Sequence, residues 1–153
     1  IDRKELNITE NNLKDKISYV PQNFYILDDT ILENIIFSEE KNKPDYEKIS
    51  KVTKLSLLDE MINSLPKGID TVVGATGKLL SGGQAQRLAL ARALYQDREI
   101  LILDEATNAL DTNTEKLVIK NISNLKKSKT VIIISHNSDI LKFCDQTIDI
   151  KNN

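Results

Sequence analysis

The chain has 153 residues, of which 40% are hydrophobic and 29% charged, and its formal net charge is −2. This balance is typical of a globular domain that buries a sizeable core, and the lack of a basic excess argues against a nucleic-acid partner. The single cysteine, Cys144, excludes an internal disulfide, and no apolar run approaches the roughly 20 residues that a membrane span needs.

Short apolar runs predict three strands. In chain order they are ISYV at residues 17–20, ILIL at 100–103 and VIII at 131–134. Continuous runs of this length are typical of strands that are buried on both faces, which favours a parallel sheet. A further run, TIDI at residues 147–150, predicts a short last strand.

The segment between the first and second strands predicts helices. Apolar residues recur at helical spacing from about residue 30 to residue 94, and no convincing strand interrupts them. Thr30 and Glu33 fit a capping box at the beginning of this segment. We therefore expect a helical subdomain inserted between the two strands.

A further helix is predicted between the second and third strands. Asp111 or Thr112 would cap it, and Thr112 with Glu115 fits a capping box. A strand, a helix and a strand in this order form a βαβ unit, so at least part of the sheet is parallel. The sequence thus predicts an α/β fold, with a mostly parallel sheet flanked by helices.

Polar side chains follow each of the three predicted strands. Gln22 follows the first, Asp104 and Glu105 the second, and His136 the third. Parallel sheets bind ligands beyond the carboxyl ends of their strands, where an aspartate is the usual holder of Mg²⁺ in a phosphate site. The next carboxylate can polarise a water for attack on phosphorus, an imidazole can bond phosphoryl oxygens, and an amide can hold a metal-bound water. The set predicts phosphate chemistry.

A glycine pair stands at the head of a predicted helix. Ser81 and Gln84 fit an S-x-x-Q capping box, and Gly82 and Gly83 lie between them. Free N–H groups and the helix dipole attract anions there, and glycines let a phosphate approach the backbone. A plain loop before a capped helix is the alternative. The chain contains no G-x-x-x-x-G-K-[ST] loop, because Lys78 is followed by a leucine.

Four motifs together resemble a known family. They are YVPQ at residues 19–22, LSGGQ at 80–84, ILILDEATNALD at 100–111 and IISHN at 133–137. In order and rough spacing they are similar to the nucleotide-binding domain of ABC transporters, specifically of exporters. The resemblance runs over nearly the whole chain.

The resemblance implies a role for each residue of the motifs. Gln22 matches the Q-loop glutamine and Asp104 the Walker B aspartate, so both are expected at Mg²⁺. Glu105 matches the catalytic glutamate and His136 the switch histidine. The remaining expected ATP-binding residues are those of the signature and the end of the D-loop: Ser81, Gly82, Gly83, Gln84 and Asp111.

The family also implies an assembly. Two such domains pair head to tail around two ATP molecules, each held between the P-loop of one domain and the signature of the other. We therefore expect ATP and Mg²⁺ as cofactors, a homodimer of nucleotide-binding domains, and the transmembrane domain of the same transporter as a partner. The expected place is the cytoplasmic face of the plasma (inner) membrane. The expected fold is like that of P-loop NTPases, with a RecA-like core at residues 1–29 and 96–153 and the helical subdomain at 30–95.

The P-loop of the family lies upstream of the position that Ile1 matches, and the chain has no initiator methionine. We therefore expect a piece of a longer protein that is inactive by itself and exposes apolar surface where upstream elements pack. The stretch Phe24–Phe37 is similar to that of exporters of lipid-linked oligosaccharides or polysaccharide precursors, which indicates a lipid-linked glycan as cargo.

Two alternatives stay open: an ABC ATPase that works outside transport, and a module without a P-loop that acts only in dimerisation. The chain also departs from the family's pattern. The D-loop begins with Asn108 where serine is usual, and Asn137 follows the histidine where arginine is usual.

Overall fold

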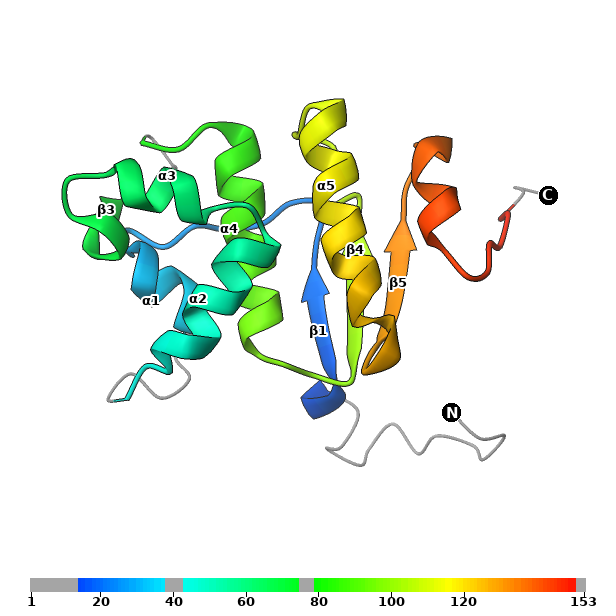
Figure 1. Ribbon diagram of the computed structural model, residues 1–153, viewed down its shortest axis with the longest axis horizontal. Helices are drawn as coiled ribbons and strands as arrows, with labels where there is room; N and C mark the ends of the chain where they lie inside the picture. The colour runs from blue at the N-terminus through cyan, green and yellow to red at the C-terminus, as the bar shows by residue number, and fades with distance from the viewer. Residues whose placement is uncertain (1–13, 38–42, 75–78, 151–153) are drawn as a thin grey trace.

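The computed structural model describes residues 14–37, 43–74 and 79–150 (Figure 1). Its main sheet has the strand order β1-β4-β5, formed by β1 (Ile17–Val20), β4 (Ile100–Asp104) and β5 (Thr130–Ile134). Both pairings are parallel. The three predicted strands and the parallel sheet are therefore confirmed.

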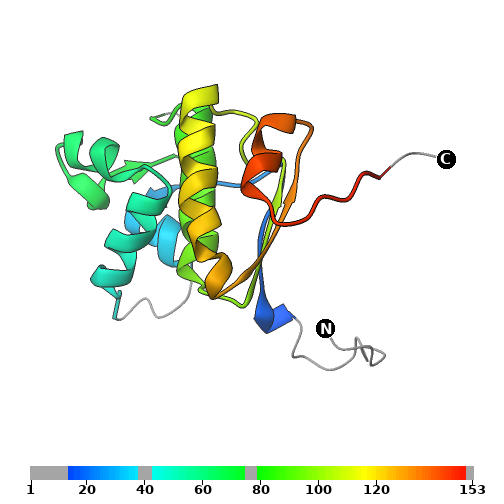
Figure 2. The same cartoon turned by 45° about the vertical axis from the view of Figure 1, so that its right-hand side comes forward.

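Helices α4 (Gly82–Tyr95) and α5 (Thr112–Ser123) lie on one side of this sheet (Figures 1 and 2). α4 leads into β4, and α5 joins β4 to β5, which makes the predicted βαβ unit. Both helices are rich in buried aliphatic residues that belong to one continuous core with the inward-facing residues of the sheet.

The opposite face of the sheet is open in the described part of the chain. Burial alternates along the strands, with Leu101 and Leu103 buried while Tyr19, Ile132 and Ile134 are 51%, 46% and 49% exposed. The prediction of strands buried on both faces is wrong for these residues, because α4 and α5 cover only one face. The open face therefore carries exposed apolar side chains.

The segment before α4 is mainly helical. Ile31, Ile49, Val52 and Leu58 are buried there and pack into the same core as α4. Its helices are α1 (Ile31–Ile36), α2 (Tyr46–Leu55) and α3 (Asp59–Ser64).

Two predictions about strands are wrong. The helical segment contains a short antiparallel pair, β2 (Asp29–Thr30) with β3 (Val72–Val73). Two-residue strands give no apolar period, so the sequence pattern did not indicate them. Residues 147–150 form no strand, and Ile148 and Ile150 are largely exposed because no element packs against them in the described chain.

Short stretches of 3-10 helix also occur in the described chain. They are η1 (Lys14–Lys16), η2 (Gly68–Asp70), η3 (Asn124–Lys127) and η4 (Ser138–Phe143). η4 packs against α5 directly after the loop that follows β5. The apolar Ile140 anchors it, because this side chain is buried within the core.

Arg92 joins α4 to the segment that follows β1. Its guanidinium donates to the Asn34 carbonyl, to Asn34 Oδ1 and to the Tyr25 carbonyl, each at 2.8 Å. It also lies over the Phe37 ring, 4.5 Å from the ring centroid. Burial lowers the pKa of Arg92 from its ordinary value. The planar arginine guanidinium can donate to all of these acceptors at once, which the single ammonium group of a lysine would do less well.

We predict that Arg92→Met lowers the free energy of unfolding by about 3 kcal/mol, because it removes two charge-assisted hydrogen bonds to the buried Asn34 and the contact with the Phe37 ring. Urea unfolding followed by circular dichroism measures this change. Lys120→Met, at an exposed position of α5, is the control and should change stability little. Equal effects of the two substitutions would contradict the structural role of Arg92.

Candidate functional site

The side chains that follow the three strands meet at Glu105. His136 Nε2 lies 2.8 Å from Glu105 Oε1, and Gln22 donates its amide hydrogen to Glu105 Oε2. Asn108 Nδ2 donates to the same Oε2 at 2.8 Å. The expected gathering of Gln22, Glu105 and His136 at one edge of the sheet is confirmed, because all three strands run in the same direction.

The backbone of Glu105 has an unusual conformation. Its φ is 49°, in the left-handed region, which costs a non-glycine residue roughly 1–2 kcal/mol. Its N–H donates to the Ile134 carbonyl at 3.0 Å, and its carbonyl accepts from the backbone N–H of Asn108 and from Gln86 Nε2, both at 3.2 Å. These bonds hold the turn, which directs the carboxylate toward the ends of β1 and β5. Strained residues held in this way cluster at functional sites.

Asp104 ends β4 beside Glu105 and has a different partner. Its Oδ2 accepts a hydrogen bond from the Tyr19 hydroxyl at 2.8 Å, and this bond raises the pKa of Tyr19. In the described ranges no cluster of three or more His, Cys, Asp or Glu residues could hold a metal ion. Mg²⁺ does not need such a cluster, because it binds through one or two carboxylates and keeps several waters. The Asp104 carboxylate therefore fits this ion.

The head of α4 has the predicted capping box. Ser81 N donates to Gln84 Oε1 at 2.9 Å, and Gln84 N donates to Ser81 Oγ at 3.2 Å. Both side chains are thus used in starting the helix. Neither forms a hydrogen bond to Asp104, Glu105 or His136 among the bonds of the described chain.

The structure gives a further reason for a glycine at position 83, which the sequence did not indicate. A Cβ added at Gly83 would lie 3.0 Å from the Ala109 carbonyl oxygen, whereas one added at Gly82 would meet only the Ala109 Cβ, at 3.7 Å. The loop after β4 therefore comes close to the backbone of α4 at Gly83. A glycine there suits the chain's own close packing, whether or not a phosphate also binds.

Asp111 caps α5. Its Oδ1 accepts from the backbone N–H groups of Asn113 and Thr114 at 3.1 and 3.0 Å, and its Oδ2 accepts from Thr114 Oγ1 at 2.6 Å. The bond from the Thr114 hydroxyl is the main cause of a lowered pKa of Asp111. Of the two predicted caps, Asp111 is the right one. The proposed box of Thr112 with Glu115 is wrong, because the Glu115 side chain bonds elsewhere.

Gln86 is a site residue that the sequence did not single out. It lies in α4, is 3% exposed, and uses both ends of its amide on the loop after β4. Its Nε2 donates to the Glu105 carbonyl, and its Oε1 accepts from Ala109 N at 2.9 Å. The signal that could have found it is an amide within a run of buried alanines and leucines.

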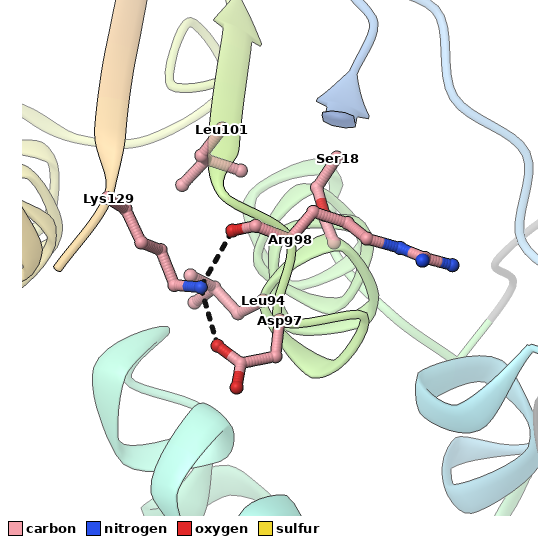
Figure 3. A pocket seen from close by; sticks show the side chains of 7 residues that line it. Ser18, Leu94, Asp97, Arg98, Leu101 and Lys129 are labelled. Carbon is pink, nitrogen blue, oxygen red and sulfur yellow. Dashed lines mark hydrogen bonds and ion pairs between the residues drawn. The ribbon is translucent and has the colours of Figure 1, made fainter. Parts of the chain in front are cut away.

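A pocket lies at the other end of the sheet. Ser18, Leu94, Asp97, Arg98 and Lys129 are among its lining residues (Figure 3). Lys129 Nζ bonds Asp97 Oδ1 at 2.5 Å and the Arg98 carbonyl at 2.7 Å. Burial alone would raise the pKa of Asp97, but Lys129 outweighs it, and the pKa lies below its ordinary value. This ion pair ties the loop after α4 to the residue that precedes β5.

The fold and the strand-end site define an α/β protein whose acidic site lies beside the head of a glycine-led helix. Residues 1–108 match the family model described as "ABC transporter". The chain belongs to the ABC transporter family.

The relatives include proteins named as a flippase and as a transport protein. The chain is 42% identical over 139 residues to "ATP-dependent lipid A-core flippase" of Vibrio vulnificus (strain YJ016), a match that covers 91% of this chain and 24% of the relative. It is 41% identical over 142 residues to "Lactococcin-G-processing and transport ATP-binding protein LagD" of Lactococcus lactis subsp. lactis, covering 93% and 20%. The chain thus spans about a quarter or less of the length of these relatives.

A solved structure has the same fold. "Structure of a bacterial Atm1-family ABC exporter with ATP bound" matches with a TM-score of 0.77 and 34% identity, over 84% of this chain and 22% of that chain. This likeness confirms the expected α/β architecture of the nucleotide-binding domain. Within the described ranges, the chain has no helix with the length and apolar character of a membrane span.

We predict that Gly83→Ala lowers the free energy of unfolding by about 1 kcal/mol, because the added methyl group is too close to a backbone carbonyl that cannot move freely. Gly82→Ala is the matched control. It should leave stability unchanged or raise it by up to about 1 kcal/mol, since alanine favours the helix more than glycine does. Urea unfolding of both variants measures the difference, and a loss at position 82 as large as at 83 would contradict the packing argument.

Proposed function

We propose that this chain is part of the ATP-hydrolysing nucleotide-binding domain of an exporter. The main observation behind this proposal is that the Glu105 carboxylate accepts hydrogen bonds from Gln22, Asn108 and His136. A carboxylate held by donors from several loops is well suited to orient a water and take its proton. The family membership of the chain supports ATP as the substrate.

Each site residue has a distinct part in this proposal. Asp104 and Gln22 would hold Mg²⁺, which when bound neutralises charge on the phosphate oxygens. Glu105 accepts the proton of the attacking water. His136, whose side chain is 91% exposed, can turn toward a phosphoryl oxygen and donate to it.

The head of α4 would bind the phosphates of ATP held by a second copy of the domain. Its capping side chains, Ser81 and Gln84, fix the helix start, and the free N–H groups around Gly82 and Gly83 are available to an anion. Asp111 would act through the position of the loop after β4, because its own carboxylate caps α5. The dimer is proposed as a homodimer.

The wider arrangement is proposed from the same family membership. Residues 1–29 and 96–153 would form the RecA-like core, and residues 30–95 the helical subdomain. The partner would be the transmembrane domain of the same transporter, and the domain would lie at the cytoplasmic face of the plasma (inner) membrane. The names of the flippase relatives support a lipid-linked glycan as cargo, whereas the relative named for lactococcin G handles a different substrate.

We predict that Glu105→Gln in the full-length protein abolishes ATP turnover and keeps nucleotide binding. The amide can still accept hydrogen bonds, but it cannot take a proton from water. Phosphate release measures turnover, and calorimetry with Mg-ATP measures binding.

Glu99→Gln is the matched control, because Glu99 lies at the other end of β4 and its exposed carboxylate pairs only with Lys16 in the described chain, at 3.3 Å. It should keep normal turnover. Near-normal ATPase activity in Glu105→Gln would contradict the assignment of Glu105 as the base.

Stimulation of ATPase activity by a lipid-linked glycan in proteoliposomes would support export, and its absence for every lipid tested would argue against this cargo.

A further inference from the structure

The loops that carry Glu105 and His136 are joined directly by the contact between these two side chains. Glu115 of α5 joins the same two loops at another point. The Glu115 side chain is buried, with the residue 6% exposed. Its Oε1 accepts a hydrogen bond from Thr107 Oγ1 at 2.7 Å, and its Oε2 accepts one from Asn137 Nδ2 at 2.6 Å. One carboxylate thus holds the loop after β4 with one oxygen and the loop after β5 with the other.

Both partners of Glu115 are firmly placed in their loops. Thr107 is 3% exposed, and its carbonyl accepts from Leu110 N at 3.0 Å. Asn137 directly follows His136, its N–H donates to Ser135 Oγ at 3.0 Å, and its Oδ1 accepts from Asp139 N at 2.9 Å. The bonds of Glu115 therefore reach the close neighbours of Glu105 and His136 in the chain.

A buried carboxylate is a costly way to fill this space. Removing a charge from water is unfavourable unless hydrogen bonds compensate for it, and both donors here are neutral. An apolar side chain would pack without this cost but could not hold two loops. The exposed His136 side chain bonds only Glu105 in the described structure, so its position depends on the backbone that Asn137 anchors.

We propose that Glu115 is a positioning residue that sets His136 relative to Glu105, by holding Thr107 and Asn137 at a fixed separation. This inference rests on the proposed ATPase function for its effect on turnover. Asn137 is the essential partner, because its amide joins Glu115 on one side and the start of η4 on the other.

The test exchanges the hydrogen-bond donor and acceptor between Asn137 and Glu115 in the full-length protein. Glu115→Ala and Asn137→Asp should each lower kcat about 10- to 100-fold and leave KM for ATP unchanged, because misplacement by about 1 Å can cost this much. Asn137→Asp places two carboxylates against each other. The double variant Glu115→Gln/Asn137→Asp restores one donor facing one acceptor, and the introduced amide can still accept from Thr107. It should recover kcat to within a few-fold of the original protein.

Lys116→Ala is the matched control. Lys116 directly follows Glu115 on α5 and forms a surface ion pair with Asp139 of η4 at 2.8 Å, so it also ties α5 to η4 without touching either loop. It should leave kcat unchanged within twofold. A loss of kcat equal to that of Glu115→Ala would overturn the proposal, and so would full activity of Glu115→Ala or failure of the double variant to recover.

Hydrogen exchange separates this proposal from the proposed function. Glu115→Ala should speed amide exchange in residues 107–110 and in residues 137–139, whereas Lys116→Ala should leave residues 107–110 unchanged. If the original protein hydrolyses no ATP, the proposed function fails, and the exchange result alone decides whether Glu115 orders both loops. Unchanged exchange in Glu115→Ala would overturn the inference regardless of activity.

Discussion

The parallel pairing of β4 with both β1 and β5 is the constraint on which the site depends. In its register Val20 lies beside Leu103, which lies beside Ile133, so the three strands end at nearly the same level. The residues that follow them must then emerge at one edge. If either outer strand ran the other way, its polar residue would lie at the opposite end of the sheet, beside the pocket of Lys129 and Asp97. The direction of the strands therefore determines which chemistry is possible.

The turn after β4 makes this edge into a site. A left-handed residue at position 105 is unfavourable by itself, so the surrounding structure must hold it. Gln86 does so from α4, and Glu115 holds Thr107 from α5. Gly83 allows this turn to rest directly on α4. The polar residues buried around the turn thus stabilise the conformation that directs the Glu105 carboxylate toward its neighbours.

Short sequence patterns predicted many of the strands, helix caps and site residues. The strands at 17–20, 100–103 and 131–134 follow from short apolar runs, and the cap at Ser81 follows from residues three apart. Since parallel strands end together, the meeting of Gln22, Glu105 and His136 could also be predicted. The parts that were missed depend on contacts between residues distant in the chain. Gln86 with Ala109 is one, and Glu115 with Asn137 is another.

The same distinction explains why the sequence leaves two interpretations of the glycine pair open, a phosphate loop and a plain loop before a capped helix. The sequence indicates that something approaches the backbone at Gly83, but it does not indicate what. In the structure the Ala109 carbonyl comes that close, so the tip of α4 and the turn that carries Glu105 are in direct backbone contact. Because α4 and α5 both hold this turn, the helix head that would meet a partner's nucleotide and the carboxylate that would act on the chain's own nucleotide share the same supporting hydrogen bonds. A substitution at Gly83 is therefore expected to disturb the loop that carries Glu105 as well as the head of α4.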